Sequence, residues 1–77
     1  MFKALKLKRR IKMCKQRIEE LEAKRLRSQG ALVDAILAHK VPDDEDVDYF
    51  NKFTLQIKAE REMLHILTEE YNRLRNR

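Results

Sequence analysis

The sequence predicts an all-α protein that folds as an antiparallel two-helix hairpin. Its composition is typical of long helices, because Lys, Arg, Glu, Leu, Ile and Ala dominate while the chain has one Gly, one Pro and no Trp. Apolar residues recur at helical spacing on both sides of a single interruption, Val41-Pro42-Asp43. A connection this short makes two consecutive helices antiparallel neighbours.

The expected elements are a helix over residues 3–40, a turn at 41–43 and a helix over 44–75, all within one domain, 1–77. Each predicted helix is far longer than the average of about 11 to 12 residues, so each needs a packing partner along its length.

Two residues of the turn define the predicted helix boundaries. Pro42 disfavours the α conformation at the residue before it. Asp43 is expected to be the N-cap of the second helix. The acidic residues that follow it suit the first turn, where negative charge interacts favourably with the helix dipole.

Each predicted helix carries a heptad stripe, and the two stripes are expected to form a coiled-coil seam. The first stripe is Ile11, Cys14, Ile18, Leu21, Arg25, Ser28, Leu32, Ala35 and His39; the second is Asp46, Phe50, Phe53, Ile57, Glu60, Leu64, Leu67, Tyr71 and Leu74. A turn centred between Pro42 and Asp43 pairs these lists from opposite ends, so that Ile11 faces Leu74 and His39 faces Asp46.

The same alignment predicts a polar layer in the seam, formed by Arg25, Glu60 and Ser28. Arg25 and Glu60 would face each other, and such a pair would specify the register, because a slip would place each charge against an apolar residue. The alternative is that both side chains reach water from the edge of the seam.

A second apolar stripe lies beside the seam on both helices. It comprises Leu26, Gly30, Val33, Leu37, Leu55, Ala59, Met63 and Ile66. A single hairpin buries only one stripe, so we expect these residues to form the interface of a homodimer, a four-helix bundle. Gly30 would allow close approach of helices. The alternative occupant is an amphipathic helix of another protein.

The formal net charge of +5 is unevenly distributed. Residues 1–27 hold eleven Lys/Arg against three Glu, and residues 28–48 hold one Lys against six acids. In a hairpin the basic chain ends converge. Candidate phosphate contacts there are Lys6, Arg9, Arg10, Lys12, Arg73 and Arg75. This pattern favours, as an alternative function, a nucleic-acid-binding regulatory protein. An acidic membrane surface and a merely solvated face are the other readings.

The residues do not form a recognisable catalytic, cofactor or metal site. Cys14 and His39 are expected far apart in the hairpin, so they form neither a metal cluster nor a nucleophile–base pair. The acidic turn lacks the glycine and the glutamate that a calcium loop needs at its sixth and twelfth positions. We therefore expect a protein that is not an enzyme and has no cofactor.

The sequence also predicts a setting and a role. One cysteine cannot form an intramolecular disulfide. No apolar run approaches the roughly 20 residues of a membrane span, and the basic start lacks the apolar region of a secretory signal. We expect a cytoplasmic, basic helical hairpin that self-associates and mediates protein–protein interaction or regulation.

Overall fold

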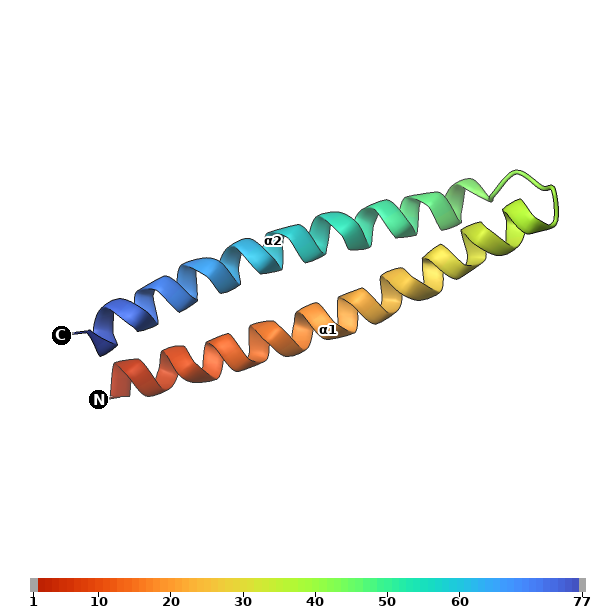
Figure 1. Cartoon of the computed structure of the whole chain (residues 1–77). Coiled ribbons are helices and arrows are strands. Elements are labelled where there is room, and N and C mark those ends of the chain that lie inside the picture. Colours follow the sequence, from red (N-terminus) through yellow and green to blue (C-terminus); the bar gives the residue numbers. More distant parts are fainter. Residues whose placement is uncertain (1, 77) are drawn as a thin grey trace.

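A computed structural model describes residues 2–76, which form two antiparallel helices lying side by side (Figure 1). Helix α1 spans Phe2–Leu37 and helix α2 spans Asp44–Arg75. The rod measures 59 × 15 × 14 Å, with both chain ends at one end and the connection at the other. The predicted all-helical hairpin is confirmed. Met1 and Arg77, the ends of the predicted domain, lie outside the described residues.

Helix α1 ends at Leu37, three residues before the predicted boundary. The N–H of His39 donates to the carbonyl of Ile36 (3.0 Å) and the N–H of Lys40 donates to that of Ala35 (2.9 Å). These two bonds form a Schellman motif, in which the residue after the C-cap adopts the left-handed conformation. His39 has the required positive φ of 57°. The predicted seam position of His39 opposite Asp46 is therefore wrong, and His39 is exposed.

Helix α2 begins where the sequence predicts. Asp43 occupies the N-cap with an extended backbone, and Asp44, Glu45 and Asp46 fill the first turn. The Asp43 side chain makes no capping hydrogen bond, although its carbonyl accepts from the Val47 N–H at 3.1 Å. The favourable feature of this helix start is therefore the negative charge of its first turn.

The predicted seam residues are the residues that the hairpin encloses. Every one of them except His39 is buried or half-buried. Their pairing differs from the prediction, because the connection spans residues 38–43 rather than 41–43. Shortening α1 brings Leu37 opposite Asp44, which moves α1 by about one turn relative to α2. Leu21 thus takes the place next to Glu60 that the sequence assigned to Arg25.

The buried residues concentrate near the chain ends. Leu7, Cys14, Ile18 and Leu67 form one cluster, against which Ile11, Leu64, Tyr71 and Leu74 pack. We call residues 2–19 and 60–76 the end half of the hairpin and residues 20–59 the turn half. All of the turn half is described, and Ile57 is its single buried residue.

Candidate interaction surfaces

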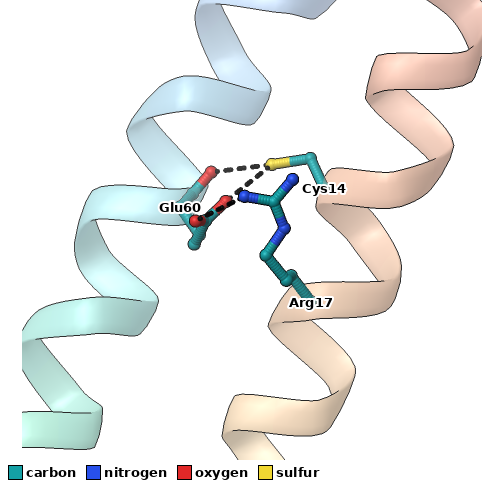
Figure 2. Close-up of polar contacts among 3 residues, drawn as sticks. All are labelled: Cys14, Arg17 and Glu60. Atoms are coloured by element: carbon teal, nitrogen blue, oxygen red, sulfur yellow. Dashed lines mark hydrogen bonds and ion pairs between the residues drawn. The ribbon is translucent and has the colours of Figure 1, made fainter.

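A polar cluster connects the helices where the two halves meet (Figure 2). The Cys14 thiol donates to the carbonyl oxygen of Glu60 (3.2 Å) and lies 3.3 Å from Oε2 of the same residue. The Arg17 guanidinium contacts Oε1 of Glu60 at 3.3 Å. One carboxylate of α2 thus binds two side chains that lie one turn apart on α1.

Burial raises the pKa of the Cys14 thiol above its ordinary value. The hydrogen bond to Glu60 and the negative charge of Glu60 raise this pKa further, whereas the nearby Arg17 charge lowers it. The nucleophile and metal ligand of a cysteine is its thiolate, so a neutral buried thiol is a poor one. Cys14 is therefore a structural residue.

The predicted contact between Arg25 and Glu60 is wrong. Glu60 pairs with Arg17, whereas Arg25 lines a surface hollow beside Ile57. The Ser28 hydroxyl donates to the Lys24 carbonyl of its own helix at 3.3 Å. The three residues are half-buried, as a seam position requires, but the one-turn change in register separates their contacts.

Two ion pairs mark the two sides of the helix–helix contact. Besides Arg17 with Glu60, Glu22 pairs with Arg61 at 2.6 Å. Successive residues of an α-helix are about 100° apart, so Arg17 and Glu22 flank the seam on opposite sides. We call these the Arg17 side and the Glu22 side. Both pairs are substantially exposed, so each contributes little to stability.

All eight residues of the second apolar stripe are exposed, and its two parts lie on different sides. Leu26 follows Glu22 by one turn, which places the α1 part on the Glu22 side and the back of α1. Ala59 and Met63, from the α2 part, line a hollow together with Arg17. The stripe is therefore two separate faces. Their burial by another chain stays a prediction.

The α1 face has room for a closely packed neighbour. A Cβ added at Gly30 would meet no atom within 4 Å, so the backbone there is open to the surroundings. Leu26 and Leu37, on either side of it along the helix, are 68% and 73% exposed. The missing side chain thus creates a shallow notch in an apolar surface.

The structure divides the candidate phosphate contacts between two sides. Arg9 and Lys12 line a shallow hollow with Leu5, Lys8 and Lys15. Lys15 lies two turns before Glu22, so this is the Glu22 side. Arg10 lines the hollow that contains Arg17, and Lys6 lies one turn before Arg10, so both belong to the Arg17 side. The sequence list omitted Lys8 and Lys15, although their spacing from Arg9 and Lys12 places all four on one helix face.

The two remaining candidates occupy the last turn of α2. Arg73 is exposed, and the guanidinium of Arg75 lies 5.9 Å from the ring centroid of Tyr71. This distance is within the range of a cation–π contact, which holds Arg75 against its own helix. Arg75 therefore contributes positive charge next to the N-terminal turns of α1.

The structure keeps the metal-binding residue types apart. His65 pairs with Glu69 on the exposed surface of α2, His39 lies in the connection, and Cys14 is in the core. Within residues 2–76, no group of three His, Cys, Asp or Glu side chains is arranged to hold a metal ion. Over the same residues, neither helix has a stretch apolar enough to cross a membrane.

Comparisons with protein-family models, curated proteins and solved structures give no match for this chain. A functional proposal therefore depends on the chain's own exposed faces.

Proposed function

We propose that this protein is a non-enzymatic helical-hairpin module that self-associates into a four-helix bundle and acts through protein–protein interaction or regulation. The observation that carries the proposal is the apolar surface of the turn half. This half buries only Ile57 of its residues 20–59, while Leu26, Ile36, Leu37 and Leu55 are each more than 60% exposed. Exposed apolar side chains gathered on a helix face are typical of an interface.

The partner we propose is a second copy of the chain, packed on the α1 face of Leu26, Gly30, Val33 and Leu37. A 77-residue chain with five buried hydrophobic residues gains substantially from a second hairpin. In a two-fold arrangement of antiparallel α1 helices, Leu26 of one copy meets Leu37 of the other, and the Gly30 notches lie near the centre.

Charge favours the antiparallel arrangement. The connection and first turn of α2 carry Asp43, Asp44, Glu45, Asp46 and Asp48, whereas residues 3–17 of α1 carry eight Lys/Arg and no acid. Antiparallel copies place the acidic turn of each toward the basic part of the other. Parallel copies would place like charges together, which disfavours association.

The module is proposed to be non-enzymatic because its polar side chains are used within the fold. The Cys14 thiol is buried and its pKa is raised, and Glu60, Arg17, Glu22 and Arg61 bind one another. These groups stabilise the contact between the helices rather than converge on a substrate pocket.

Sedimentation equilibrium of the purified chain, between about 1 and 100 µM, tests the proposal over the range of moderate affinities. The wild type is expected to change from monomer to dimer. Val33→Glu should weaken dimerisation more than 10-fold, because a carboxylate would be buried in the interface. Gly30→Leu should do the same by filling the notch, with the monomer's helicity unchanged.

Met63→Glu is the matched control. Val33 and Met63 are 43% and 44% exposed, and they lie on the Glu22 side and the Arg17 side respectively. The control should dimerise like the wild type. A wild type that stays monomeric at 100 µM would overturn self-association. Equal losses in Val33→Glu and Met63→Glu would overturn the choice of the α1 face.

A further inference from the structure

The N-terminal half of α1 has a charge pattern that helix stability does not explain. Eight of the fifteen residues 3–17 are Lys or Arg, and none is acidic. The helix begins at Phe2 and has no acidic residue in its first turn. Positive charge at a helix N-terminus opposes the helix dipole, so these residues destabilise α1 slightly. Their abundance at this position requires another cause.

One group of these residues forms a continuous face. Lys8, Arg9, Lys12 and Lys15 surround Leu5 along a shallow hollow on the Glu22 side. All four are exposed, and none of them takes part in an ion pair of the described residues. By contrast, Arg17 on the opposite side is paired with Glu60. The face therefore presents four positive charges available to an external anion.

The apolar side of this segment is already occupied. A helix that binds a membrane surface inserts its apolar side among the lipid chains. Here Leu7, Ile11, Cys14 and Ile18 pack against α2, so the surface left outside is mainly cationic. A hydrophilic polyanion suits that surface better than lipid does. Residues 3–17 extend about 21 Å at 1.5 Å per residue, comparable to about six base pairs of duplex.

We propose that Lys8, Arg9, Lys12 and Lys15 bind the phosphate backbone of a nucleic acid. This inference goes beyond self-association, because the proposed dimer face of residues 26–37 lies nearer the turn. Phosphate contacts of this kind carry no base specificity, so the site fits duplexes of any sequence. An antiparallel dimer would present one such face toward each end.

The test is fluorescence anisotropy of labelled 20-base-pair DNA and RNA duplexes and of a single strand, titrated with the full chain at about 50 and 200 mM salt. Four phosphate contacts predict a slope of log K against log salt of about −3.6, and hence a loss of about 100-fold over this range. Preference among the three probes identifies the form of nucleic acid.

Two double variants of equal charge separate the face from general electrostatics. Lys8→Gln with Lys12→Gln should weaken binding about 10-fold and make the slope shallower by about 1.8. Lys3→Gln with Lys6→Gln removes the same charge from the same helix away from the face, and should change affinity less than about 3-fold. Circular dichroism should be unchanged in both, because all four lysines are exposed.

Three results would overturn the inference. The first is no binding to any of the probes by 100 µM protein at the lower salt. The second is an equal effect of both double variants, which would leave only nonspecific charge. The third is binding to phosphatidylserine-containing vesicles without binding to nucleic acid. Because Val33→Glu leaves the basic face intact, its binding to a duplex tests this inference even where self-association fails.

Discussion

The end half of the hairpin buries Leu7, Cys14, Ile18 and Leu67 in one cluster, whereas the turn half buries only Ile57 of its residues 20–59. The cause is visible in the α1 seam, where the end half has Leu7, Ile11, Cys14 and Ile18 and the turn half has Arg25, Ser28, Leu32 and Ala35. Polar and small residues provide less apolar area to bury.

The surfaces differ in the opposite sense. Outside its core, the α1 segment of the end half is basic, whereas the turn half exposes leucine and isoleucine on α1 and acids at the connection. The comparison teaches that one continuous heptad seam can support two tasks. One half is stabilised by its own core and leaves charge outside, and the other depends on a further surface to cover its apolar residues.

The largest effect should come from a cavity in the end half. Leu67→Ala should lower the free energy of unfolding by about 2 to 5 kcal/mol, because Leu67 is 3% exposed in the core cluster. Leu55→Ala, the same substitution at a 67% exposed position of the turn half, should change it by less than about 0.5 kcal/mol. Urea denaturation near 1 µM measures both. Similar losses would remove the distinction between the halves.

A smaller effect is expected at the connection. His39→Gly should stabilise the hairpin by about 1 kcal/mol, since glycine adopts the left-handed conformation without the steric cost that a Cβ imposes. Gln29→Gly, at an exposed interior position of α1, should destabilise it by about the same amount. The two variants are compared by the same denaturation experiment. A loss of stability in His39→Gly would contradict the Schellman geometry and the register derived from it.

The smallest effect concerns the Cys14 thiol. Because the folded state raises its pKa above the ordinary value of 9.0, the folded protein holds this proton more tightly than the unfolded chain does. The resulting stability is complete below that value and is lost as the pH rises through the raised pKa. Between about pH 8 and 10, the wild type should therefore lose more stability than Cys14→Ala. Parallel declines of the two proteins would contradict the assignment.

Much of the fold could be predicted from the sequence, because periodicity depends on local spacing. The stripes identified the seam residues, and Pro42 with Asp43 located the start of α2. The register could not be predicted, because it depends on where α1 ends. That end is a left-handed histidine rather than the glycine that usually signals it. An error of three residues there changed the partner of Glu60 from Arg25 to Arg17.

The interaction surfaces were predicted less completely. The apolar residues of the second stripe are exposed, as an interface would require, but the hairpin places its α1 and α2 parts on different sides. The choice of phosphate contacts by charge alone mixed the two sides of α1 and left out Lys8 and Lys15. Both errors come from treating each stripe as a property of the chain rather than of a helix face with a neighbour.

Hydrogen exchange detected by mass spectrometry, at about 1 and 100 µM protein, tests the central claim most directly, because exchange protection follows local stability. The account predicts that amides of residues 20–37 and 44–59 gain protection at the higher concentration, as a second copy covers the turn half. Amides of residues 6–19 and 60–72 should already be the better protected at low concentration and should change little. Equal protection of both halves, unaffected by concentration, would contradict it.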